Sequence, residues 1–274
     1  MKLSCLPVSF FKQIIEGEMS IGEWARIGKE AGLDAIDLSV LFLKSLDEDY
    51  LAEVRDEIES NGMSLAMVTS YPDFTHPDPE ERVRQIEREK AYISAVGRLG
   101  GKLIRMTSGQ AHPGLRDEDG IRWALEGLFA CEEAGLEAGV KLVLENHGKP
   151  GNWDYTDFDQ PTHIFLALAE GIRDTSIGIN FDTANPIAFG DDPLPILEKV
   201  IDRVASIHAS DTETRGALNH VLLGTGLVPF RELFGYLKSS GFDGWICMEE
   251  NSRLGRQGLL DATAFVKRTW SEAG

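Results

Sequence analysis

The sequence is poor in positive charge, and it has no long apolar run. Its 27 Lys and Arg residues stand against 45 Asp and Glu residues, which gives a net charge of −18. A surface this acidic repels phosphate backbones and anionic lipid, so we expect binding neither to nucleic acid nor to a membrane surface. No stretch approaches the roughly 18–20 consecutive apolar residues that a membrane-spanning helix needs.

Cysteine and phosphate-binding motifs are scarce as well. Cys5, Cys131 and Cys247 are odd in number and far apart, so they form neither a disulfide framework nor a zinc-ribbon spacing. This predicts a reducing, cytoplasmic setting. The apolar segment 1–11 contains Pro7 and no small-residue cleavage site, so we interpret it as a first strand and not as a signal peptide. The glycine-rich motifs that bind nucleotide phosphates are absent.

Short apolar runs alternate along the chain with longer amphipathic stretches. The runs predict eight strands, at 2–9, 34–40, 63–69, 102–107, 140–145, 177–182, 203–209 and 243–249. Eight strand–helix units in 274 residues leave about 34 residues each, which matches a (β/α)8 barrel. Because no linker or shift of composition divides the chain, we predict a single α/β domain, a TIM barrel over residues 1–274. The alternative, a doubly wound open sheet, would normally have fewer strands and a glycine-rich turn.

Local signals mark the ends of several predicted helices. Ser20, with Glu23 three residues later, forms a capping box at the start of a helix over 20–31. Gly139 follows a helix predicted over 117–138, where glycine accepts the left-handed conformation that ends a helix. These signals set the helices between the predicted strands.

A carboxylate or an imidazole ends each of the last four predicted strands. These residues are Glu145, Asp182, His208 and Glu249. In a barrel the C-terminal strand ends face one mouth, where active sites sit, so the four side chains would meet there. The set suits Mn²⁺, Mg²⁺, Co²⁺ or Zn²⁺, and without a cation its three carboxylates would repel one another. Any one carboxylate alone could cap the next helix, but capping does not explain four consecutive strand ends.

Further polar residues near these strand ends are candidates for substrate binding. They are His147, Asn185, Asp211, Arg105 and Arg253. Asp211 could instead orient His208, the two arginines are candidate anion contacts, and a structural hydrogen bond or ion pair is the alternative for each. Glu250 has the opposite strand parity to Glu249, so we prefer Glu249 as the metal ligand.

The same segments resemble a known superfamily. Leu-Glu145-Asn-His147, Phe-Asp182-Thr-Ala-Asn185, Ile-His208-Ala-Ser-Asp211 and Met-Glu249-Glu-Asn are similar to segments of the xylose isomerase-like TIM barrels. That superfamily includes sugar phosphate isomerases and epimerases, hydroxypyruvate isomerase, inosose dehydratase and endonuclease IV. The stretch from His220 to Gly226 also resembles its Gly-x-Gly segment before the seventh helix. The match covers nearly the whole chain.

The resemblance implies that Glu145, Asp182, His208 and Glu249 bind the metal. It also implies that Glu145 and Glu249 act as acid and base on opposite faces of a substrate. A metal on the carbonyl and a neighbouring hydroxyl would stabilise an enediolate, which makes removal of the α proton feasible. We therefore expect a divalent-metal-dependent isomerase or epimerase of a sugar, sugar phosphate or related hydroxy-ketone. Its partner would be that small molecule, and a homo-oligomer stays open.

Two positions depart from the ketose 3-epimerases of the tagatose type. Those enzymes have His where this chain has Asn185, and Arg where it has Thr214, with Arg215 next to it. The Asp-x-x-Asn form is closer to the isomerase and dehydratase branches, so a dehydratase (lyase) of a keto-inositol or similar polyol ketone is the alternative. An endonuclease-IV-like hydrolase would need more metal ligands and a basic surface. A non-enzymatic sugar-binding barrel is the last alternative.

Overall fold

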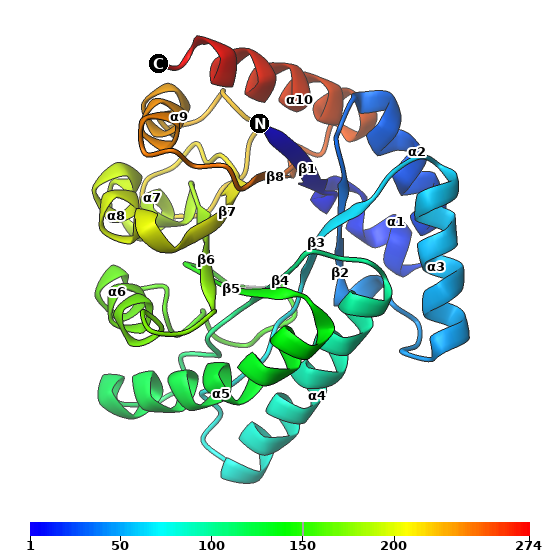
Figure 1. Cartoon of the computed structure of the whole chain (residues 1–274). Helices are drawn as coiled ribbons and strands as arrows, with labels where there is room; N and C mark the ends of the chain where they lie inside the picture. Colours follow the sequence, from blue (N-terminus) through cyan, green and yellow to red (C-terminus); the bar gives the residue numbers. More distant parts are fainter. Residues whose placement is uncertain (150) are drawn as a thin grey trace.

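Eight short parallel strands enclose the centre of the molecule, and helices surround them (Figure 1). The computed structural model describes residues 1–149 and 151–274. The strands are β1 (Lys2–Leu6), β2 (Ile36–Ser39), β3 (Leu65–Thr69), β4 (Leu103–Met106), β5 (Lys141–Glu145), β6 (Gly178–Asp182), β7 (Val204–Ala209) and β8 (Trp245–Glu249). This nearly closed parallel sheet confirms the predicted TIM barrel, and all eight predicted strands are present.

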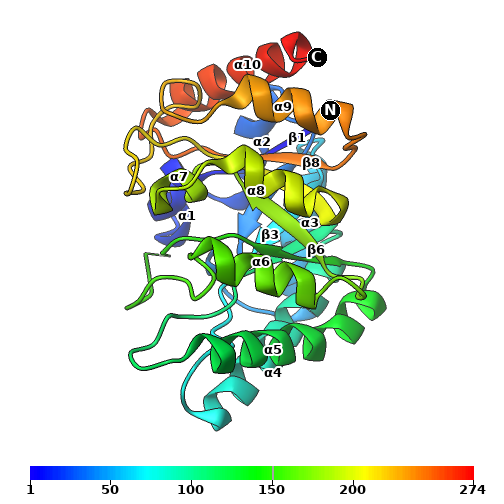
Figure 2. The same cartoon turned by 90° about the vertical axis from the view of Figure 1, so that its left-hand side faces the viewer.

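The helices fall into an outer ring and a few short elements close to the strand ends. The longer ones are α2 (Ile21–Ala31), α3 (Glu48–Ser60), α4 (Pro79–Arg98), α5 (Asp117–Ala138), α6 (Thr162–Gly171), α8 (Pro193–Val200), α9 (Phe230–Ser239) and α10 (Gly255–Glu272). The short ones are α1 (Phe11–Ile15), α7 (Asn185–Phe189) and the 3-10 helices η1 (Val8–Phe10), η2 (Val40–Phe42) and η3 (Ile201–Arg203). Figure 2 shows α1 and α7 at the same end of the barrel. No helix in the described residues is long and apolar enough to cross a membrane.

The first strand ends earlier than the sequence predicts. Strand β1 stops at Leu6, and residues 8 and 9, which we expected to belong to it, are part of η1 instead. Pro7 has no amide hydrogen for the strand ladder, which explains why the strand ends before it. The turn directs Val8 to the cavity described below.

The capping signals in the sequence are confirmed. The Ser20 hydroxyl accepts a hydrogen bond from the Glu23 amide at 3.0 Å, at the start of α2. Helix α5 ends at Gly139, whose φ of 67° lies in the left-handed region that glycine tolerates. The first cap starts α2, and the second stops α5 just before β5.

The barrel is not closed by strand pairing all the way round. Hydrogen-bonded strands run in the order β1-β8-β7-β6-β5-β4-β3-β2, so the described ladder leaves a seam between β1 and β2. Asp34, just before β2, bridges this seam. Its carboxylate accepts a hydrogen bond from the Leu3 amide at 2.9 Å, and its own amide donates to the Leu3 carbonyl at 2.9 Å.

Apolar and polar side chains share the interior of the barrel. A separate apolar cluster comes from the first three positions of four strands, and its members are Met67, Leu103, Val143 and Cys247. Farther along the strands, the buried side chains include Glu145, Asp182 and His208. A buried carboxyl group also lies against the apolar cluster, because Asp37 accepts hydrogen bonds from the Met67 amide at 3.1 Å and from the Ser4 hydroxyl at 2.7 Å.

One buried carboxyl group on α4 makes stability depend on pH. Glu89 is 1% exposed, and it accepts a hydrogen bond from the Ser70 hydroxyl at 2.5 Å. Burial raises the pKa of Glu89 from 4.5 to about 7, more than the Ser70 hydrogen bond and the Arg105 charge lower it. Between these pH values the folded protein holds a proton that the unfolded chain has released, so the free energy of unfolding falls as the pH rises.

We expect Glu89→Gln to remove this dependence. The substitution should raise the free energy of unfolding at pH 8 by up to about 3 kcal/mol and change it little at pH 4. Urea denaturation of both proteins from pH 4 to pH 8 measures the difference. Glu87→Gln, an exposed residue of the same helix that pairs with Lys90, is the matched control. A difference between Glu89→Gln and wild type that stays constant with pH would contradict the prediction.

Candidate metal centre and active site

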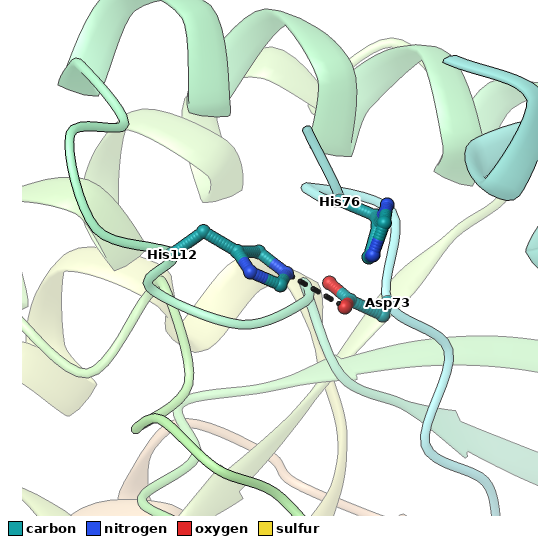
Figure 3. Close-up of side chains that lie close together, drawn as sticks. All are labelled: Asp73, His76 and His112. Atoms are coloured by element: carbon teal, nitrogen blue, oxygen red, sulfur yellow. Dashed lines mark hydrogen bonds and ion pairs between the residues drawn. The ribbon is translucent and has the colours of Figure 1, made fainter. Parts of the chain in front are cut away.

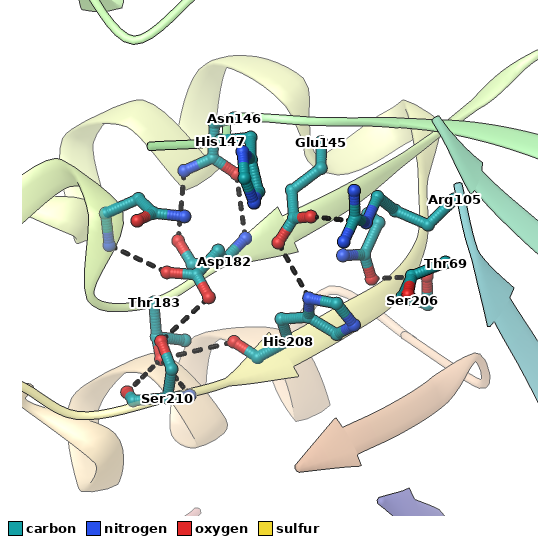
Figure 4. A network of polar contacts seen from close by, with 12 residues as sticks. Thr69, Arg105, Glu145, Asn146, His147, Asp182, Thr183, Ser206, His208 and Ser210 are labelled. Atoms are coloured by element: carbon teal, nitrogen blue, oxygen red, sulfur yellow. Dashed lines mark hydrogen bonds and ion pairs between the residues drawn. The ribbon is translucent and has the colours of Figure 1, made fainter. Parts of the chain in front are cut away.

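Three of the predicted metal ligands meet at the mouth of the barrel. Glu145 and Asp182 are the last residues of β5 and β6, and His208 stands next to last in β7. Each offers one ligand atom, and these atoms all lie within 4.8 Å of one another. Figure 4 shows the three side chains close together, and all three are almost completely buried.

The charges of Glu145, His208 and Arg105 are tightly paired. The Nδ1 atom of His208 lies 2.7 Å from Oε1 of Glu145, and Nε of Arg105 lies 2.7 Å from its Oε2. Burial disfavours the ionised Glu145, but the charges of His208 and Arg105 outweigh it and lower the pKa of Glu145 to about 2. Burial likewise disfavours protonated His208, and the Glu145 charge outweighs it, raising the pKa of His208 to about 9. Glu145 is therefore held as a carboxylate.

Asp182 has the opposite electrostatic environment. Burial and the negative charges of Glu145 and Glu249 raise the pKa of Asp182 to about 7. Its position is fixed, because Oδ1 accepts hydrogen bonds from the Ala184 and Asn185 amides and Oδ2 accepts one from the Ser210 hydroxyl at 2.7 Å. A bound cation would offset the repulsion between Asp182 and the neighbouring carboxylates, and would favour the ionised form of Asp182.

The residues present fit a divalent cation. Neighbouring ligands around one ion lie roughly 3 Å apart when each bond is 2.0–2.2 Å long, close to the separation of Glu145 Oε1 and His208 Nδ1. Two carboxylates and an imidazole form a mixed oxygen and nitrogen donor set, which suits Mn²⁺, Mg²⁺, Co²⁺ or Zn²⁺. Arg105 already neutralises part of the negative charge, so one divalent ion would bring the site close to balance.

The fourth predicted ligand lies outside this group of three. Glu249 ends β8 and is half-buried, and its side chain lines the same cavity. Its neighbour Glu250 is buried elsewhere, where Oε1 accepts a hydrogen bond from the Ser252 amide at 2.9 Å. The strand parity that favoured Glu249 over Glu250 therefore gives the side-chain directions correctly.

The residues that follow the ligands tie the strand ends together. The Asn146 side chain donates to the Asp182 carbonyl at 3.0 Å and accepts from the Asp182 amide at 2.7 Å, which links β5 to β6. Thr183 donates its amide to the His208 carbonyl at 3.0 Å and its hydroxyl to the Ser210 carbonyl at 2.7 Å, which links β6 to β7 (Figure 4). We did not single out Asn146 or Thr183 from the sequence, although both directly follow a predicted ligand.

A cavity of about 740 Å³, within the range of sites that bind small molecules, lies beside the three candidate ligands. None of the three lines it, but Arg105, which pairs with Glu145, and Asn185, whose amide donates to Asp182, do. One part of its lining is apolar and comes from the segments after β1 and β2: Val8, Phe11, Ile15 and Leu41. The polar part includes Tyr71, Arg105, His147, Lys149, Asn152, Asn185, His220, Glu249 and Asn251. Among these polar residues, Tyr71 also contacts Arg105: the guanidinium carbon of Arg105 lies 4.8 Å from the centroid of the Tyr71 ring.

The five predicted substrate residues divide into two groups. Arg105, His147 and Asn185 line the cavity. Asp211 and Arg253 are outside its lining: Arg253 is exposed, with a φ of 63°. Asp211 is buried and accepts hydrogen bonds from backbone amides of the loop after β7, those of Gly224, Gly226 and Val228. The structure therefore gives Asp211 a role in shaping that loop and does not bring it to the cavity.

His147 has a buried partner that the sequence did not reveal. Its Nδ1 lies 3.5 Å from Oδ2 of Asp157, which is fully buried. Oδ1 of Asp157 accepts a hydrogen bond from the Ser108 hydroxyl, so the loops after β4 and β5 are joined behind His147. This contact depends on a turn ten residues after His147, and no periodic pattern in the sequence marks it.

Comparisons with known proteins agree with this geometry. The chain is 25% identical over 153 residues to inosose dehydratase from Lacticaseibacillus casei, and the match covers 50% of this chain but only about half (49%) of that enzyme. It is 23% identical over 285 residues to an L-ribulose-5-phosphate 3-epimerase from Shigella boydii, which covers 98% of this chain and 96% of the epimerase. The crystal structure of a D-tagatose 3-epimerase-like protein superposes with a TM-score of 0.80 at 17% identity, over 100% of this chain and 98% of that one.

At these identities the structural likeness establishes the fold, and the relatives differ in the reactions named for them. The family assignment comes from a broader match. A sequence model of the xylose isomerase-like TIM barrel matches residues 25–269, nearly the whole barrel and all three ligands at its mouth. The chain belongs to the xylose isomerase-like TIM barrel family.

Proposed function

We propose that the chain is a divalent-metal-dependent isomerase or epimerase of a sugar, sugar phosphate or related hydroxy-ketone. The observation that carries the proposal is the convergence of Glu145, Asp182 and His208 next to a cavity of about 740 Å³ that Arg105 and Glu249 line. The relatives named as epimerases support the same class of reaction. The partner of this site would be a small sugar-like molecule.

In this proposal Glu145, Asp182 and His208 hold the ion, and Glu249 completes the set from β8. A bound divalent cation supplies Lewis acidity, which makes the hydrogen next to a substrate carbonyl acidic enough to be removed. Arg105 holds Glu145 in its ionised form and in one orientation. Asp182 is oriented by the amides at the start of α7 and by Ser210.

The two glutamates have different access to the substrate. Glu249 is half-buried and lines the cavity, so its carboxylate can take up a proton from a bound substrate. Glu145 lies deeper, between Arg105 and His208. In an epimerase the two would exchange protons on opposite faces of one carbon. In an isomerase Glu249 would move the proton between neighbouring carbons.

We propose that the part of the substrate that fills most of the cavity is uncharged. Of the described residues that line it, only Arg105 and Lys149 carry a fixed positive charge. The guanidinium of Arg105 is already engaged by Glu145 and by the Ser70 carbonyl, to which Nη1 donates at 2.9 Å. Hydroxyl groups find many partners in this lining, whereas a phosphate would depend mainly on Lys149.

The dehydratase alternative has its own support. His147 lines the cavity two residues from Glu145 and can donate a proton to a departing hydroxyl group. The relative from Lacticaseibacillus casei is named as an inosose dehydratase. In that reaction Glu249 would remove the α proton, and His147 would assist loss of the β-hydroxyl as water.

Glu249→Gln should lower kcat by about 10³-fold with a smaller change in KM, because the amide cannot accept the proton. Turnover of the metal-loaded enzyme on its best substrate, in a panel of ketoses and inososes, measures the effect. Glu250→Gln is the matched control, since Glu250 is adjacent in sequence but faces Ser252. Equal losses in both variants would argue against a role for Glu249 in proton transfer.

The two reactions give different products in D₂O. An isomerase or epimerase should place deuterium on the carbon next to the carbonyl without loss of water, whereas a dehydratase should produce an enone or diketone with ultraviolet absorption. NMR and absorbance spectra of the metal-loaded enzyme with the same panel distinguish them. If no substrate exchanges hydrogen or loses water in the presence of any of the four metals, the proposed function is wrong.

A further inference from the structure

A second cluster of metal-ligating side chains lies outside the barrel site. Asp73 and His76 belong to the loop between β3 and α4, and His112 belongs to the loop between β4 and α5. Among the described residues, groups of three or more such side chains with ligand atoms within 4.8 Å number two, the barrel site and this one. Figure 3 shows both imidazoles directed toward the Asp73 carboxylate.

The distances within the cluster resemble those of the barrel site. Nε2 of His112 lies 2.8 Å from Oδ2 of Asp73, as Nδ1 of His208 lies 2.7 Å from Oε1 of Glu145. The rings of His76 and His112 are edge to face, with centroids 5.0 Å apart. The three ligand atoms therefore need only a small convergence to surround one ion.

The carboxylate of this cluster is held in place before any ion binds. Asp73 is 5% exposed, and it accepts hydrogen bonds from the Gln110 amide at 2.9 Å and from the Gln110 side chain at 3.0 Å. The hydroxyl of Thr75 donates to the Gln110 carbonyl at 2.8 Å, and Arg82 donates to the His76 carbonyl at 2.7 Å. The two loops are thus fixed against each other with the ligands facing inward.

We propose that Asp73, His76 and His112 form a second divalent-cation site, suited to Zn²⁺. Two imidazoles and one carboxylate are the three-ligand set that Zn²⁺ accepts, with water in a fourth, tetrahedral position. Both histidines are partly exposed, the His112 side chain to 12%, so water can reach the cluster. The proposal goes beyond the function proposed above and does not depend on it.

The protonation of His76 sets a condition on binding. Its Nδ1 now accepts a hydrogen bond from the Asp78 amide at 3.1 Å, so the proton of the neutral ring is on Nε2. Binding through Nε2 requires that proton to move to Nδ1, with loss of this exposed hydrogen bond. Binding through Nε2 of His112 likewise replaces its contact with Oδ2 of Asp73. Three bonds to the ion replace these contacts, and binding releases protons from any protonated ligand, so affinity should fall as the pH is lowered.

The ion would act on the wall of the active-site cavity without touching the substrate. Gln110, which holds Asp73, also accepts hydrogen bonds through its side-chain oxygen from the amides of Asp154 and Tyr155. These residues follow closely after Gly151 and Asn152, which line the cavity. An ion at the second site would therefore restrict the motion of three loops at the barrel mouth at once.

Metal counting on the full-length protein tests the proposal. After equilibrium dialysis against Zn²⁺, we expect two ions per chain for wild type and one for the Glu145→Gln/Asp182→Asn variant, which lacks two barrel ligands. Adding His112→Ala to that variant should remove the last ion. His163→Ala, at an exposed histidine that pairs with Asp117 on the surface, is the control and should leave every count unchanged.

A milder variant and an absorption spectrum distinguish loss of metal binding from loss of folding. In the Glu145→Gln/Asp182→Asn variant (the barrel-site variant), Zn²⁺ should raise Tm by binding at the second site. Adding His76→Gln, in a half-exposed loop position, should weaken this binding by at least tenfold and abolish the rise in Tm. With Co²⁺ in the barrel-site variant, we expect the intense visible absorption of four-coordinate cobalt. If that variant is folded and binds no ion, the proposal is wrong and the cluster is a hydrogen-bonded loop contact. If wild type binds one ion and His112→Ala removes it, the barrel site is empty. That result would count against the proposed function and not against this second site.

Discussion

The concentration of charge in a dry barrel mouth is the constraint on which the rest of this structure depends. Glu145, Asp182, His208 and Arg105 are almost fully removed from water, where an unpaired charge would be very unfavourable. Their contacts compensate for burial only in one arrangement, with Glu145 between the imidazole and the guanidinium. The ends of neighbouring strands must therefore keep a fixed register. Asn146 and Thr183 stabilise it by hydrogen bonding to the end of the next strand.

Much of the fold and of the candidate site could be predicted from the sequence, because both follow from short-range regularities. Apolar runs of strand length and glycines at helix ends place the eight strands. In a parallel barrel, residues that end successive strands must face one mouth, so Glu145, Asp182 and His208 come together whatever the loops do. The early end of β1 at Pro7 was missed because the apolar run continues past it.

The parts that could not be predicted depend on long-range contacts through loops. Asp211 follows His208 in a pattern that suggests an active-site role, yet its carboxylate shapes a loop through backbone amides. Arg105 was a candidate anion contact, and the structure shows it paired with Glu145. The cluster of Asp73 and His112 joins residues 39 positions apart in two loops. Such contacts depend on the conformation of loops, and loop sequences have no periodic pattern from which these contacts could be predicted.

The seam between β1 and β2 divides the barrel mouth into two regions with different freedom to change. The proposed metal ligands Glu145, Asp182 and His208 stand on β5 to β7, where the ladder and the strand-end bonds are continuous. The apolar wall of the cavity comes from segments after β1 and β2, which are joined at Asp34 and not by a ladder. Substitutions in that wall can alter which molecules fit without moving the charged groups. One barrel of this kind can therefore diverge in substrate while its chemistry stays constant.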